Sequence, residues 1–112
     1  MEAILARSAR RVREWEALRE RARAALPGLV DVLVREFGAR RVVLFGSMVR
    51  GFGSDEPDID LLVEGLSPAG LAAASGRLTL LAPLPVDLVP AETGRPEVVR
   101  RALEEGDVLH ES

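Results

Sequence analysis

Residues 41–63 decide the fold of this chain and read Arg41-Val-Val-Leu-Phe45-Gly46-Ser47-Met-Val-Arg50-Gly-Phe-Gly-Ser-Asp-Glu-Pro57-Asp58-Ile-Asp60-Leu-Leu-Val63. The apolar runs 42–45 and 61–63 are typical of strands buried in a sheet, and the second strand is expected over 59–63. A Gly-Ser turn ends the first strand, and an Asp-Ile-Asp triplet opens the second. Because side chains two positions apart on a strand point to one face, Asp58 and Asp60 are expected side by side.

Helical patterns surround these strands. Apolar residues recur at spacings of three, four and seven over 3–25, which predicts an amphipathic helix. We expect that helix to break at Pro27-Gly28, with a second helix over 29–37 that ends at Gly38. A short helix should follow Gly46, and a loop should follow Arg50. The expected order after 63 is a helix over 68–81, a strand over 86–89, a helix from 95 to Gly106 and an edge strand over 107–111.

This alternation predicts a single α/β (α+β) domain with a small mixed sheet and helices packed against it. At 112 residues the chain can bury one modest core, and we see no repeat or linker. The expected organisation is an N-terminal amphipathic helix over 1–26 and the remaining domain over 27–112. The helix is either a solvated surface helix with i,i+4 ion pairs or a partner-binding face, for example a homo-oligomer contact.

The composition excludes several kinds of function. A net charge of -3 and a pI near 5.2 argue against a free-standing nucleic-acid binder, which usually needs a basic face. With no Lys, no Cys and one His, the chain cannot use a lysine Schiff base or a thiolate metal site, so any metal site must be made of oxygen. No apolar run is long enough to span a membrane and no signal peptide is recognisable, so we expect a cytoplasmic protein.

The acidic residues predict a cation site. Asp58 and Asp60 repel each other unless a cation lies between them, and Mg²⁺ prefers such oxygen ligands. Asp87 lies in an otherwise apolar strand. If that strand pairs with the one that starts at Asp58, Asp87 completes a triad suited to two Mg²⁺ ions and can act as general base. The alternative is that all three are solvated carboxylates at strand ends.

The Gly-Ser turn predicts a phosphate site. Gly46 and Ser47 follow a strand and open a short helix, where amides and a hydroxyl can face the phosphates of a nucleotide. Arg50 could neutralise phosphate charge, although a surface ion pair is an equally good interpretation. Gly-Ser after a strand is otherwise an ordinary turn.

Taken together, Gly46-Ser47, the Asp58-x-Asp60 pair and the later Asp87 resemble the signature of the minimal nucleotidyltransferase (MNT) family, within the DNA polymerase β-type nucleotidyltransferase superfamily. The resemblance runs from about residue 29 to 111 and includes the closing segment 105–111. It implies the polymerase β-like nucleotidyltransferase fold.

The resemblance also implies a function. Such a protein transfers a nucleoside monophosphate, with AMP from ATP as the first expectation, to a hydroxyl acceptor, with Mg²⁺ as cofactor. The implied roles are metal binding and catalysis for Asp58, Asp60 and Asp87, and nucleotide binding for Gly46, Ser47 and Arg50. Families of this kind often accompany a helical HEPN protein as the antitoxin of a toxin–antitoxin pair, in which they modify the partner.

Three other functions stay open. The domain could bind a nucleotide or partner without catalysis, or act on a small-molecule hydroxyl as antibiotic nucleotidyltransferases do. It could also be a purely structural domain in which the motif is a coincidence.

Overall fold

A computed structural model describes residues 2–50 and 57–112, with side chains described from residue 9 onward in these ranges. Its four strands form one mixed sheet in the order β3-β2-β1-β4. Strand β1 (Arg41–Phe45) runs antiparallel to both β2 (Ile59–Glu64) and β4 (Asp107–Glu111), while β2 is parallel to β3 (Val86–Pro90). The helices are α1 (Glu2–Arg35), α2 (Ser47–Arg50), α3 (Pro68–Leu81) and α4 (Pro96–Glu105). The predicted small mixed sheet with packed helices is confirmed.

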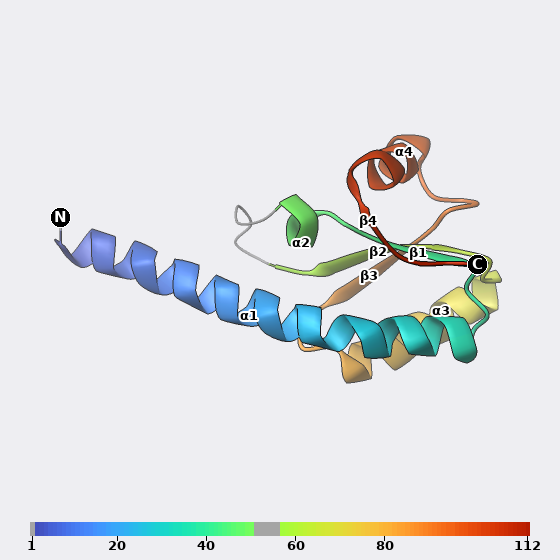
Figure 1. Cartoon of the computed structure of the whole chain (residues 1–112), viewed down its shortest axis with the longest axis horizontal. Coiled ribbons are helices and arrows are strands. Elements are labelled where there is room, and N and C mark those ends of the chain that lie inside the picture. The colour runs from blue at the N-terminus through green and yellow to red at the C-terminus, as the bar shows by residue number, and fades with distance from the viewer. Residues whose placement is uncertain (1, 51–56) are drawn as a thin grey trace.

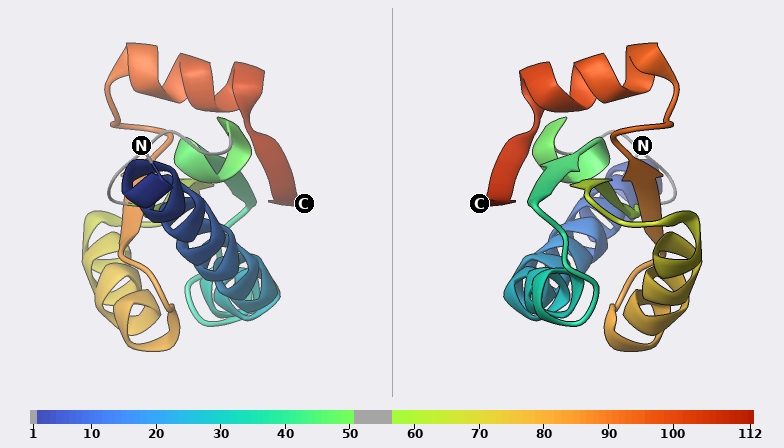
Figure 2. Two further views of the ribbon diagram at one scale, coloured as in Figure 1. Left: turned by 90° about the vertical axis from the view of Figure 1, so that its left-hand side faces the viewer. Right: turned by 90° about the vertical axis from the view of Figure 1, so that its right-hand side faces the viewer.

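The helices cover the two faces of the sheet unequally. Helices α1 and α3 lie against one face, and α4 crosses the other (Figures 1 and 2). Alternate side chains of the central strands therefore enter two separate clusters. Val42, Leu44, Ile59, Leu61 and Val63 pack with α1 and α3, while the second cluster joins Val43 and Leu62 to Ala102 of α4.

This arrangement explains why β1 and β2 read as continuous apolar runs rather than as alternating ones. Both strands are central, and residues 42–44 and 61–63 are all buried. A strand covered on both faces needs apolar side chains on both. The edge strand β4 is mostly exposed in comparison, as a strand with a single neighbour should be.

The predicted break at Pro27-Gly28 is wrong, because α1 is one helix of 34 residues that contains Pro27. A proline inside a helix removes one hydrogen bond and costs about 3 kcal/mol. Burial outweighs this cost: Leu26, Leu29 and Leu33 are all buried in the main core, so one continuous helix is needed to place them together. Pro27 itself is exposed.

The first part of α1 extends beyond the sheet, as Figure 1 shows. Where side chains are described it is nevertheless more than a solvated helix, since Trp15 is 5% exposed and Ala22 is fully buried. Arg19 stacks over the Trp15 ring at 5.5 Å from its centroid. Arg19 and Arg23 each donate a hydrogen bond to the Met48 carbonyl, at 2.9 and 3.1 Å. Because carbonyls near a helix end lack intrahelical donors, these two arginines stabilise α2.

Among the helices that the structure describes, none combines the length and the apolar composition needed to traverse a lipid bilayer. The loop predicted after Arg50 lies outside the described residues, apart from Pro57 and Asp58.

Candidate active site

The three predicted aspartates lie at one end of the sheet, where the parallel strands β2 and β3 begin. Asp58 immediately precedes β2, Asp60 is its second residue and Asp87 is the second residue of β3. Asp60 and Asp87 are direct partners in the parallel register. Partners on adjacent strands have side chains on the same face, so the structure brings these carboxylates together.

The aspartates share the face of the sheet that α4 covers. Along β2, Asp60 alternates with the core residues Ile59 and Leu61 and therefore lies on the side of Leu62, which packs with α4. Asp87 lies on the side of Val89 for the same reason. Asp58 and Asp60 are half-buried, whereas Asp87 is exposed. The cluster is thus open to solvent on the β3 side, where an acceptor could approach.

The environment of Asp60 raises its pKa to about 7. Partial burial is the largest cause, followed by the charge of Asp58 and a hydrogen bond with its carboxyl group, and then by the charge of Asp87. The positive charge of Arg50 lowers the pKa in part. The three carboxylates are therefore close enough to repel one another, which leaves the cluster short of positive charge.

The donor set fits hard divalent cations, which take carboxylate oxygens. No set of three or more acidic or histidine side chains within residues 2–50 and 57–112 already has the spacing of a metal-ligand shell. Bound ions would relieve the repulsion between the aspartates. Asp58, Asp60 and Asp87 are the residues that would hold them.

The Gly-Ser turn lies directly against the acidic cluster. Gly46 adopts a φ of +74° at the end of β1, a conformation that favours glycine. A Cβ atom at Gly46 would lie 3.1 Å from the Asp60 carboxyl carbon and closer still to its Oδ2. Ser47 is buried, and its hydroxyl donates to the Asp58 carbonyl oxygen at 3.5 Å. The turn and the acidic cluster therefore form one continuous site.

Helix α4 supplies residues that sequence reasoning missed. A hollow of about 180 Å³ beside Asp60 is lined by Phe45, Gly46, Arg50, Asp60, Val98, Arg101 and Glu105. Val98, Arg101 and Glu105 recur at helical spacing and so share one face of α4. The amphipathic pattern of α4 could identify its core face, but only the packing of the helix across the sheet shows which flank adjoins the aspartates.

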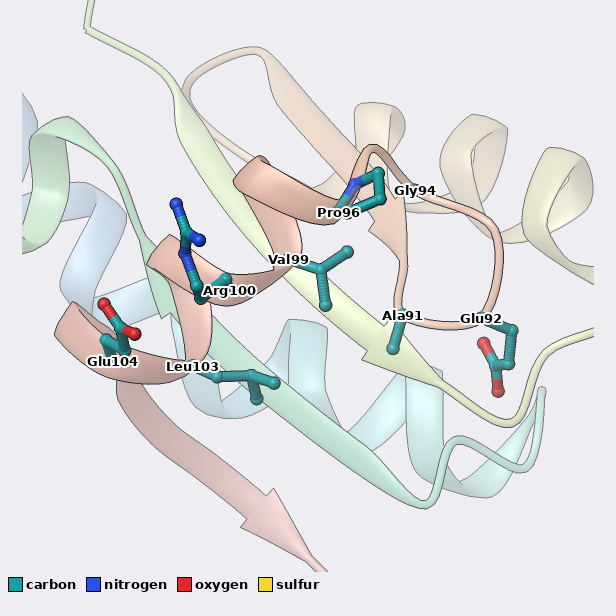
Figure 3. Close-up of a pocket in the computed structure, with 8 residues that line it drawn as sticks. All are labelled: Ala91, Glu92, Gly94, Pro96, Val99, Arg100, Leu103 and Glu104. Carbon is teal, nitrogen blue, oxygen red and sulfur yellow. The ribbon is translucent and has the colours of Figure 1, made fainter.

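A second hollow, of about 580 Å³, lies on the other flank of α4 (Figure 3). Val99 and Leu103 of α4 face Ala91 and Glu92 of the loop after β3, and Arg100 and Glu104 line its edge. None of the predicted site residues lines this hollow.

Comparisons with known proteins agree with this geometry. The family described as the nucleotidyltransferase domain matches residues 26–109. A solved structure described as that of a "putative minimal nucleotidyltransferase" is 32% identical over 83% of this chain and 93% of that one, with a TM-score of 0.59. No curated protein matches the chain.

Two solved toxin–antitoxin structures share the fold. One is a complex with AMP-PNP, 21% identical over 76% of this chain and 73% of that one, with a TM-score of 0.64. The other is a variant of the MntA-HpeT complex, 21% identical over 77% and 72%, with a TM-score of 0.63.

Proposed function

The chain belongs to the nucleotidyltransferase domain family, as a minimal nucleotidyltransferase with the polymerase β-like fold, and from this premise we propose that it transfers AMP from ATP to a hydroxyl group of a partner protein. The reaction requires Mg²⁺. The observation that carries the proposal is the convergence of Asp58, Asp60 and Asp87 beside the Gly46-Ser47 turn.

In the proposed reaction the acceptor oxygen attacks the α-phosphorus of ATP. The new oxygen–phosphorus bond forms as the bond between the α-phosphorus and the bridging oxygen to the β-phosphorus breaks, and pyrophosphate leaves with that electron pair. Asp87, which is exposed at the open side of the cluster, takes the proton of the acceptor hydroxyl. Gly46 and Ser47 hold the triphosphate so that the α-phosphorus faces the acceptor.

Asp58 and Asp60 would hold two Mg²⁺ ions and Asp87 one of them. The ions, when bound, neutralise phosphate charge and make the acceptor hydroxyl more acidic. The raised pKa of Asp60 supports this assignment, because a carboxyl group whose charge is disfavoured by burial and by the neighbouring aspartates gains much from a cation. Arg50, which borders Asp60, adds a further positive charge for the phosphates.

The proposed partner is a helical HEPN-type toxin that the transfer inactivates. The fold shared with the toxin–antitoxin structures supports this choice.

The test is to mix the purified chain with MgATP and each short helical protein encoded beside it. The masses of both proteins are then measured by mass spectrometry. We expect the partner to gain the mass of one AMP or more, and no gain with EDTA or with the variant Asp58→Asn/Asp60→Asn. Parallel reactions with GTP, CTP and UTP test the base preference. A partner that is neutralised equally by the variant, without any gain in mass, would establish a non-catalytic binding module instead.

A further inference from the structure

Helix α4 carries two neighbouring arginines that line different hollows. Arg101 lines the hollow that contains Gly46, Arg50 and Asp60, whereas Arg100 lines the hollow on the opposite flank. The two residues have the same charge, are both exposed and are adjacent in the chain. Only Arg101 adjoins the candidate active site.

The two arginines of the site-side hollow form no ion pair with any residue that the structure describes. In the part of the chain that the structure describes, no carboxylate lies within 4 Å of the guanidinium nitrogens of Arg50 or Arg101. Other arginines of the fold are engaged: Arg41 pairs with Glu64, Arg77 with Glu36 and Arg35 with Asp31. Unpaired guanidinium groups that border a hollow are typical of phosphate sites.

The charge of the hollow is nevertheless not simply positive, because Asp60 and Glu105 also line it. Glu105 lies four positions after Arg101, on the same face of α4. An anion that enters would be attracted by Arg50 and Arg101 and repelled by Glu105. Substitutions of Arg101 and Glu105 should therefore change anion affinity in opposite directions.

We infer that Arg101 is a phosphate-binding residue of this site and that, with Arg50, it binds the β- and γ-phosphates of the nucleotide from the side of α4. The inference rests on the proposed function, which places the triphosphate at Gly46 and Ser47. Gly46 itself lines the hollow, so a phosphate chain bound at the turn extends between Arg50 and Arg101. The same two guanidinium groups then neutralise the pyrophosphate as it leaves.

The need for this second arginine follows from the charges. Three carboxylates, a triphosphate and only two divalent cations leave an excess of negative charge, which Arg50 alone does not balance. In a protein without Lys, bidentate contacts from guanidinium groups are the strongest way to reduce this excess of negative charge.

The experiment is calorimetric titration of the full chain and of the variants Arg101→Gln, Arg100→Gln and Glu105→Gln. The two ligands are MgATP and magnesium tripolyphosphate, which lacks the nucleoside. We expect Arg101→Gln to lower the affinity for both ligands about tenfold, because a charge-assisted contact is lost. Arg100→Gln should change neither affinity by more than about twofold. Glu105→Gln should raise the affinity for both ligands.

Equal affinities for Arg101→Gln and Arg100→Gln would overturn the inference and leave the proposed function in place. If Arg101→Gln lowers the affinity for MgATP but not for magnesium tripolyphosphate, Arg101 contacts the nucleoside, which also contradicts the inference. If the unsubstituted chain binds neither ligand, the proposed function itself is wrong. Melting temperatures show whether each variant folds. Arg101→Lys keeps the charge but not the planar guanidinium group, so its affinities should lie between those of the unsubstituted chain and of Arg101→Gln.

Discussion

Gly46 at the end of β1 lies so close to Asp60 that a Cβ atom there would force the Asp60 carboxyl group to shift. The φ of +74° at Gly46 adds a second constraint, because residues with a Cβ adopt this conformation at a cost of about 1–2 kcal/mol. Two independent features therefore favour glycine at the point where the Gly46-Ser47 turn meets the acidic cluster.

Gly46→Ala tests this relationship. We expect the free energy of unfolding to fall by about 1–3 kcal/mol, since the methyl group adds strain and must displace Asp60. MgATP binding should be lost as the carboxyl group moves. Urea denaturation and calorimetry measure the two effects.

Gly76→Ala is the matched control, because Gly76 lies inside α3 with open space around it and an ordinary helical backbone. The free energy of unfolding of this variant should rise by about 0.5–1 kcal/mol, and its MgATP binding should be unchanged. Equal behaviour of the two alanine variants would contradict the packing described for Gly46.

Asp60 should make the cation-free protein less stable as the pH rises. Its pKa in the folded state is about 7, above the ordinary value of 3.8. The folded state thus retains a proton that the unfolded state releases, so the contribution to stability is full below about pH 4 and is lost as the pH rises through about 7. We expect Asp60→Asn, which cannot ionise, to melt at a higher temperature than the unsubstituted chain at pH 8, and at nearly the same temperature at pH 4.

Mg²⁺ provides the control for this comparison. Saturating Mg²⁺ should raise the melting temperature of the unsubstituted chain at pH 8 and should not raise that of Asp60→Asn to the same extent. A difference between the two proteins that is constant from pH 4 to 8 would show that burial and the neighbouring carboxylates do not raise the pKa of Asp60.

Pro27 tests whether α1 folds as one unit with the sheet. Pro27→Ala restores a backbone amide in the middle of an exposed helix surface, and we expect the free energy of unfolding to rise by on the order of 1–3 kcal/mol. Chemical denaturation followed by Trp15 fluorescence and by far-UV circular dichroism should give one coincident transition. Two transitions, with Pro27→Ala affecting only one, would instead support a division into residues 1–26 and 27–112.

The sequence was sufficient to predict most of the fold. The apolar runs of β1 and β2 and the stop signals at Gly38 and Gly106 gave the strands and helix ends close to their observed positions. The polymerase β-like fold inferred from the Gly-Ser and Asp-x-Asp pattern is confirmed. The helix break at Pro27 was wrong because local propensity was outweighed by the burial of Leu26, Leu29 and Leu33.

The site could be predicted only in part. Asp58, Asp60 and Asp87 were predicted from the combined pattern of the Gly-Ser turn, the Asp-x-Asp pair and the later strand aspartate, and their roles stay a prediction. The structure adds that the parallel pairing of β2 with β3 makes Asp60 and Asp87 register partners. Arg101 and Glu105 belong to an ordinary charged helix in the sequence. Their position beside Asp60 depends on how α4 crosses the sheet, and no local pattern determines that crossing.

The central claim is that the three aspartates and the Gly46-Ser47 turn form one cation-dependent nucleotide site. Its most direct measurement is calorimetric titration of ATP into the chain with Mg²⁺ and with EDTA, repeated for Asp58→Asn/Asp60→Asn. The account predicts binding only for the unsubstituted chain in Mg²⁺. Equal ATP binding by the double variant, or binding that EDTA does not abolish, would contradict it.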